Sequence, residues 1–189
     1  MRRRTVLLVL GLVALLGLVA GFGYLPEDET PPPRLTEEQL LAYEAALLPH
    51  LREGGKTVER GMKPGVDDLL NKHVVPPATI AVEAETWAAD LTRVRTALAA
   101  VEPPPQLTEV SQLFDDSLDA YVQAAHVFAE AARAPEAQRR AIANRGYDLG
   151  RTADRIYDSA SRIIQTARRN LGLGPSSDFP DPETRDAPS

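Results

Sequence analysis

The fold of this chain is decided by residues 137–171, which read AQRRAIANRGYDLGRTADRIYDSASRIIQTARRNL. Apolar residues recur there every seven positions, which is the pattern of a long helix packed in a bundle. A row of large residues runs beside a row of small ones: Ile142, Leu149, Ile156 and Ile163 beside Gly146, Ala153, Ala160 and Ala167. Because small residues let a neighbouring helix come close, this stretch predicts a helix with a tight contact.

Proline and glycine mark the limits of this helix. Pro135 stands where a helix opens, and Gly172 stands where it ends as a C-cap. Inside the helix, Gly146 and Gly150 each lower helix propensity by about 1 kcal/mol, which predicts a close contact or a bend. Beyond Gly172 the sequence is rich in Pro, Ser and Asp, and we expect a disordered tail at residues 173–189.

Two further helices are predicted upstream, each ended by proline. One begins at Pro76-Pro77 and ends at Pro103-Pro104-Pro105, and the other spans residues 107–132. Trp87 lies on the apolar face of the first, so we expect it in the core rather than on a ligand site. The apolar positions recur at helical spacing: Ile80, Ala84, Trp87, Leu91, Val94, Leu98 and Val101, then Leu107, Val110, Phe114, Leu118, Tyr121, Ala125, Phe128 and Ala132.

The first helix is the least regular part of the pattern. Thr36 is placed to cap it, with a glutamine three residues later that completes a capping box. Its apolar face continues to about residue 62, where Pro49 and Gly54-Gly55 should kink the helix. The sequence Met62-Lys63-Pro64-Gly65 should then break it before a shorter helix at residues 66–73. We therefore expect the first helix to be kinked or split.

Together these elements predict an all-α fold, an antiparallel four-helix-type bundle at residues 36–172. The chain has 189 residues, a net charge of −6 and no cysteine. The absence of cysteine excludes disulfides, thiolate metal sites and thiol nucleophiles. An acidic domain is a poor partner for nucleic acid, so we expect none to bind.

The N-terminus predicts a membrane segment. Residues 5–25 carry no charge and follow three arginines, Arg2-Arg3-Arg4. As a helix this segment would span roughly 31 Å, close to the thickness of a bilayer core. The basic end predicts a cytoplasmic N-terminus with the bundle outside the cell membrane, joined by a proline-rich spacer at residues 26–35. The alternative is that residues 1–25 are a signal segment and that the domain is secreted after cleavage.

Charge is unequal between the last two helices. Residues 107–132 contain acidic residues and no Lys or Arg, whereas the last helix is rich in arginine. Five of its arginines fall on one strip: Arg140, Arg151, Arg155, Arg162 and Arg169. One interpretation is that this arginine strip pairs with Asp115, Asp116 and Asp119 and fixes the helix register. The other is a docking surface for an acidic protein or another envelope component.

No catalytic or cofactor-binding residue is predicted. The Glu-x-x-His pairs of di-iron bundles, the zinc-protease motifs and the phosphate-binding loops are absent from the sequence. Asp115, Asp119 and His126 are only weak candidates for a metal site, because helical carboxylates without loop ligands bind cations poorly.

We therefore expect a membrane-anchored, extracytoplasmic helical bundle with a binding or structural role and no catalytic activity. The alternative is a secreted or anchored bundle that binds a small ligand or a metal. A filled core would favour the first, and a polar cavity containing His126 or the aspartates would favour the second.

Overall fold

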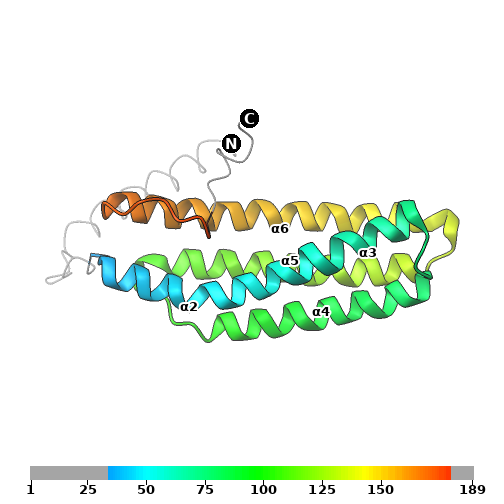
Figure 1. Cartoon of the computed structure of the whole chain (residues 1–189), viewed down its shortest axis with the longest axis horizontal. Helices are drawn as coiled ribbons and strands as arrows, with labels where there is room; N and C mark the ends of the chain where they lie inside the picture. Colours follow the sequence, from blue (N-terminus) through cyan, green and yellow to red (C-terminus); the bar gives the residue numbers. More distant parts are fainter. Residues whose placement is uncertain (1–33, 180–189) are drawn as a thin grey trace, which may run out of the picture. The chain divides into compact units, whose positions relative to one another are not determined.

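The computed structural model describes residues 34–179, and every regular element in this part of the chain is a helix. The predicted all-α bundle is confirmed for these residues. The predicted membrane segment at residues 5–25 and the spacer up to residue 33 lie outside the described part. The elements, shown in Figure 1, are α2 (Glu37–Lys56), η1 (Thr57–Met62), α3 (Lys63–Asp67), η2 (Asp68–Lys72), α4 (Pro77–Ala99), η3 (Pro105–Leu107), α5 (Thr108–Arg133) and α6 (Glu136–Asn170).

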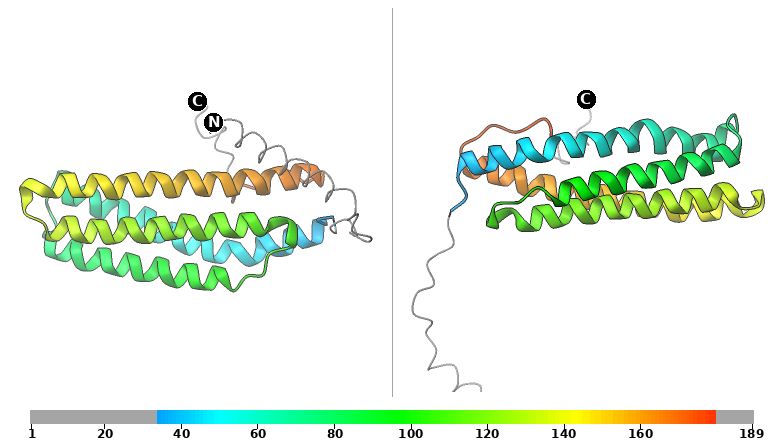
Figure 2. Two further views of the ribbon diagram at one scale, coloured as in Figure 1. Left: turned by 180° about the vertical axis from the view of Figure 1, so that it is seen from behind. Right: turned by 90° about the horizontal axis from the view of Figure 1, so that it is seen from below.

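The elements form four long helical rods that run alternately in opposite directions (Figures 1 and 2). The first rod comprises α2, η1, α3 and η2, and the others are α4, α5 and α6. Helix α5 packs closely against both α4 and α6, whereas the first rod packs mainly on α4 and touches α6 much less. The side of the bundle between the first rod and α6 is therefore the most loosely packed.

The ends of the helices lie close to the positions that capping residues, proline and glycine predict. The Thr36 hydroxyl accepts a hydrogen bond from the Gln39 amide at 3.2 Å, and the Gln39 side chain accepts one from the Thr36 amide at 3.0 Å. This is the predicted capping box. Pro135 precedes α6, and Gly172 follows it with a φ of 75°, a left-handed conformation that suits glycine.

The prediction of a break in the first helix is wrong, because the helix continues from residue 37 to residue 72. It passes through Pro49 and, further on, through Pro64. The turn before Pro64 is a π-helix, in which the Lys63 amide donates to the Val58 carbonyl five residues earlier. Proline has no N–H and its ring collides with the carbonyl four residues before it. A widened turn relieves this conflict without ending the helix.

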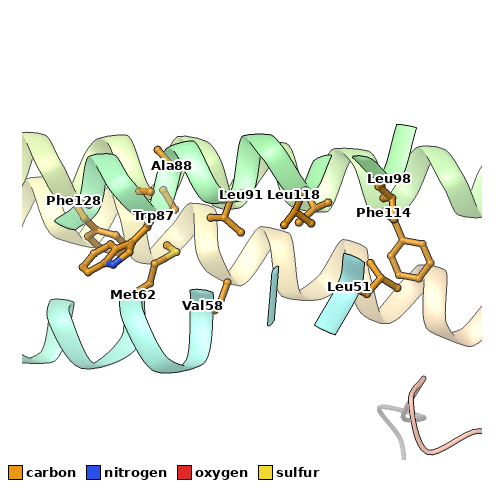
Figure 3. Packing of buried hydrophobic residues seen from close by; sticks show 14 of the residues in the cluster. Leu51, Val58, Met62, Trp87, Ala88, Leu91, Leu98, Phe114, Leu118 and Phe128 are labelled. Atoms are coloured by element: carbon orange, nitrogen blue, oxygen red, sulfur yellow. The ribbon is translucent and has the colours of Figure 1, made fainter. Parts of the chain in front are cut away.

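Two glycines of the first rod, one of them in the predicted break, make room for Trp87. A Cβ atom at Gly61 would lie 2.9 Å from the indole nitrogen of Trp87, and one at Gly65 would lie 2.5 Å from its ring carbon Cη2. The indole lies against the first rod beside Met62 (Figure 3). Trp87 is 7% exposed, so its predicted place in the core is confirmed. The glycines are needed for packing across the bundle and not for a turn.

On α6 the row of small residues faces the core. Ala153 and Ala160 are fully buried, whereas the large row beside them is only half-buried. A Cβ atom at Gly146 would lie 2.6 Å from the Phe128 ring, which confirms a close contact there. Gly150 has nothing within 4 Å of the same position.

The segment after α6 differs from the expected disordered tail at residues 173–189. Residues 173–179 fold back along the bundle, and Phe179 is fully buried. The Gln165 amide donates to the carbonyls of Ser176 and Phe179, and Arg168 donates to the Gly174 carbonyl at 2.7 Å. These hydrogen bonds hold the backbone while Phe179 completes the core. Residues 180–189 lie outside the described part.

Candidate functional site

A cleft lies between the first rod and α6, with α5 as its floor. Its volume is about 290 Å³. Figure 3 shows several of its lining residues, among them Leu51, Val58, Phe114 and Leu118, next to the core. The lining residues come from three rods: Leu51, Gly54, Gly55, Val58, Glu59 and Lys63 from the first, Phe114, Ser117, Leu118 and Tyr121 from α5, and Asp154, Tyr157 and Asp158 from α6.

Aromatic rings and small residues shape the cleft. Phe114 and Tyr157 meet with ring centroids 5.3 Å apart and an interplanar angle of 59°. Gly54 is packed against Leu118, whereas Gly55 presents open space to the cleft, with no atom within 4 Å of an added Cβ. The cleft is therefore apolar at its floor and unobstructed at its mouth.

The polar groups of the cleft are mainly acidic. The Tyr121 hydroxyl donates a hydrogen bond to the Asp154 carboxylate. Burial raises the pKa of the Tyr121 hydroxyl, and its hydrogen bond to Asp154 and the charges of Asp154, Glu59 and Asp158 raise it further. Glu59 forms an ion pair with Lys63 one turn later on the same rod. Carboxylates from both walls of the cleft therefore raise the pKa of the same hydroxyl group, that of Tyr121.

A second hollow of about 110 Å³ continues the cleft along α6. It shares Val58, Lys63, Tyr121 and Asp154 with the first and extends to the Phe128–Tyr147 pair, whose ring centroids are 5.7 Å apart. At the opposite end, Phe179 of the C-terminal segment lies 6.2 Å from Phe114, centroid to centroid. The cleft is thus the open middle of a longer seam between the first rod and α6.

The predicted pairing between the arginine strip and the acidic residues of α5 is wrong. Arg95 of α4 binds Asp115 with two hydrogen bonds of 2.7 and 2.8 Å and also binds Asp119. Asp116 accepts a hydrogen bond from Gln112 on its own helix. Asp115 and Asp119 therefore face α4, whereas Glu130 of α5 pairs with Arg145 of α6, an arginine outside the strip, at 2.8 Å. The direction in which a side chain points depends on how each helix is rotated in the bundle.

All five arginines of the strip are exposed. Arg140 donates to the Leu70 carbonyl at 3.0 Å, Arg151 pairs with Asp148, and Arg155 donates to the Arg151 carbonyl at 3.2 Å. Arg162 and Arg169 form no ion pair within residues 34–179. The strip therefore does not pair with the aspartates of α5. Its interpretation as a docking surface stays a prediction.

The weak metal candidates do not form a site in the described part of the chain. Asp115 and Asp119 are both engaged by the Arg95 guanidinium, and His126 is exposed about two turns further along α5. Residues 34–179 contain no group of three or more His, Asp or Glu side chains placed to hold a metal ion. The cleft contains neither His126 nor these aspartates.

The cleft cannot be read from the sequence. The sequence pattern puts Tyr121 on an apolar face, and it assigns no role to Asp154 or Asp158. The one available signal was their spacing of four, which puts the two aspartates on one face of α6. That spacing does not reveal how far the first rod stands from α6.

Comparison with other proteins adds no family assignment: no protein-family model, no curated protein and no solved structure matches this chain. Within the residues that the structure describes, no helix is both long enough and apolar enough to cross a membrane. The interpretation of the cleft therefore depends on its own geometry and chemistry.

Proposed function

We propose that this chain is a non-catalytic binding module held on the outer side of a cell membrane, and that its side cleft is the recognition site. The observation that supports a binding role is the cleft of about 290 Å³, lined by residues of three rods. Ligand sites in helical bundles are commonly apolar hollows between helices with a few convergent polar groups. Here these groups are the Tyr121–Asp154 pair, Glu59 and Asp158.

The membrane part of the proposal comes from the sequence. Residues 5–25 lack charge and follow three arginines, which supports a single-pass anchor with a cytoplasmic N-terminus. The test is fractionation of cells followed by protease treatment from outside. The chain should stay with the membranes and be digested beyond residue 26. A soluble mature protein that begins between residues 20 and 25 would instead support a cleaved signal and a secreted module.

The recognition part can be tested with a photo-crosslinker attached to a single introduced cysteine. Attachment is specific because the chain has no cysteine of its own. Gly55→Cys places a single reactive thiol at the mouth of the cleft, where a new side chain meets open space. Glu83→Cys is the matched control, at an exposed position on α4. Each variant is labelled with a benzophenone reagent and illuminated in its native membrane.

An adduct should form from position 55 and not from position 83. Unlabelled wild-type protein added in excess should suppress it, whereas unlabelled Gly55→Leu, in which a side chain blocks the cleft, should not. Equal adducts from both positions, or equal suppression by both competitors, would show that recognition occurs elsewhere on the bundle.

The arginine strip is the second candidate surface. Its exposure, and the absence of ion pairs at Arg162 and Arg169 within the described residues, favour an acidic partner. Changing both of these arginines to Gln should leave folding intact and weaken capture of that partner from a membrane extract. If the same change leaves the position-55 adduct intact, two separate surfaces are in use.

A further inference from the structure

The cleft and the smaller hollow adjoin along the seam between the first rod and α6, and together they form one long channel. Four residues line both of them, among them Val58 and Tyr121. Phe114 lines the cleft and Phe128 lines the smaller hollow, and Figure 3 shows these rings at the two ends of one row of buried side chains. Phe128 is fourteen positions after Phe114 in α5, which corresponds to roughly 21 Å of helix. The channel is therefore long and follows the axis of the bundle.

The part of α5 that forms the floor of the channel offers apolar surface to a ligand. Leu118 lies between the two phenylalanines in the row that Figure 3 shows. The two hydroxyl groups of this floor have partners: Ser117 donates to the Ala153 carbonyl at 2.9 Å, and Tyr121 donates to the Asp154 carboxylate. Both hydroxyls would stay satisfied under an apolar chain. The floor therefore favours a ligand that is itself apolar over one that needs polar partners.

The walls of the channel are apolar at depth and charged at the mouth. Met62 and Val66 of the first rod line the smaller hollow and are buried. An uncharged chain that lies on these side chains leaves the charged groups of the lining in water, so its binding does not depend on their charges. Those groups are exposed or half-exposed to solvent: Glu59, Lys63, Arg151, Asp154 and Asp158.

Two glycines keep the channel open on opposite walls. Gly55 of the first rod lines the cleft, and Gly150 of α6 lines the smaller hollow. A Cβ atom added at either position would meet no atom within 4 Å. Glycine within a helix is less favourable than alanine, and no close packing explains it at these two positions. Space for a ligand accounts for both glycines.

The size of the channel selects the kind of apolar ligand. An α-helix roughly 21 Å long and about 10 Å across occupies more than about 1,500 Å³. The two hollows have volumes of about 290 and 110 Å³, so a partner helix is too wide. A single acyl chain is narrow and reaches roughly 15 Å, half the thickness of a bilayer core, so it fits lengthwise.

We propose that the channel binds the acyl chain of a single-chain lipid, laid along the row of rings in α5, with the lipid headgroup outside in water. This inference rests on the proposed function, because it names the class of ligand that the recognition site accepts. The proposed membrane anchor would hold this site near a source of lipid. Burial of the apolar chain drives binding, and the chain has to occupy both hollows.

The test uses palmitoyl lysophosphatidylcholine that carries a photoreactive diazirine on its chain. The probe is added to the full-length protein in nanodiscs of zwitterionic lipid and illuminated, and adducts are located by mass spectrometry of peptides. Adducts should form in residues 114–128 of α5, on the floor of the channel. The adduct on the protein belt of the nanodisc measures how much probe each sample received.

Leucine substitutions block the two hollows one at a time. Gly55→Leu fills the cleft, and Gly150→Leu fills the smaller hollow. Gly174→Leu is the matched control, because it adds the same side chain at an equally open position outside both hollows. Either blocking variant should lower the adduct on the bundle at least about tenfold, because each removes several CH₂ groups from the buried part of the chain. The control should leave this adduct unchanged.

A competition on the wild-type protein replaces the variants if they do not fold. Unlabelled palmitoyl lysophosphatidylcholine in excess should suppress the adduct on the bundle. The hexanoyl lipid with the same headgroup should not suppress it, because its chain is too short to occupy both hollows.

The outcomes distinguish this inference from the proposed function. An adduct on the bundle that survives in either blocking variant would overturn the inference, because a chain laid along the channel needs both hollows. Equal suppression by the long and the short lipid would also overturn it, as would a bundle without adducts beside a labelled nanodisc belt. The crosslinking comparison of positions 55 and 83 does not depend on these results and tests the proposed function by itself.

Discussion

Two glycines one turn apart in α6 should respond in opposite ways to the same substitution. At Gly146 an added Cβ atom would lie 2.6 Å from Cε1 of Phe128 and 2.9 Å from two further ring carbons. The ring is 5% exposed and meets Tyr147 edge to face, so it has little room to move. Overpacking of this kind costs about 1–3 kcal/mol, and better helix propensity returns about 1 kcal/mol. We expect Gly146→Ala to lower the free energy of unfolding by about 1 kcal/mol.

At Gly150 the same added atom meets nothing within 4 Å. Only the gain in helix propensity and the loss of freedom in the unfolded chain remain, so Gly150→Ala should raise the free energy of unfolding by about 0.5–1 kcal/mol. The two variants should thus differ by about 2 kcal/mol, although both replace glycine with alanine in one helix. Urea unfolding of the full-length protein, followed by circular dichroism at 222 nm, measures each difference.

A third substitution identifies the cause. In a Phe128→Leu background the ring is gone, so Gly146→Ala should no longer cost stability. A double-mutant cycle between positions 128 and 146 measures this coupling. A coupling free energy near zero between positions 128 and 146 would refute the contact. Equal stabilisation by Gly146→Ala and Gly150→Ala in the wild-type background would also refute the contact.

The other predictions concern the core, the C-terminal segment and alkaline pH. Ala160→Leu should lower the free energy of unfolding by about 1–3 kcal/mol, because Ala160 is fully buried and has no space for a larger side chain; thermal melts measure this. Phe179→Ala should cost about 2–3 kcal/mol and make the C-terminal segment a faster target for limited proteolysis, since burial of one phenyl ring holds it in place. Because the raised pKa of Tyr121 means that the folded state keeps this proton more tightly than the unfolded state, stability should fall as the pH rises above about 10. Tyr121→Phe should make that fall shallower in a pH series of melts.

Helices α4, α5 and α6 could be predicted from the sequence because the residues that define them lie within each helix or next to its ends. Prolines mark the ends of α4, α5 and α6, and apolar residues recur at helical spacing between them. The continuity of the first rod was predicted wrongly, because the contacts that explain its glycines are not local. Gly61 and Gly65 serve Trp87, which belongs to another rod, and a pattern within one segment cannot show this.

The ion pairs and the cleft illustrate a second limit of the sequence pattern. Net charge per helix is readable, but the partner of each charge depends on how the helix is rotated and which neighbour it faces. Asp115 therefore binds Arg95 of α4 rather than an arginine of α6. The cleft depends on the distance between the first rod and α6, two segments that are far apart in the chain, and so it became visible only in the structure.

Charged side chains are distributed unevenly along the seam between the first rod and α6. At one end, Glu44 and Arg168 form an almost buried ion pair that joins the two rods. Toward the middle, Glu59 of the first rod and Asp154 of α6 line the cleft from opposite walls, and both side chains are exposed to solvent. Separating the partners of a buried ion pair leaves charges uncompensated in the protein interior, whereas exposed carboxylates stay hydrated whether the rods move apart or not. The seam should therefore resist opening more strongly at the Glu44–Arg168 end than at the cleft.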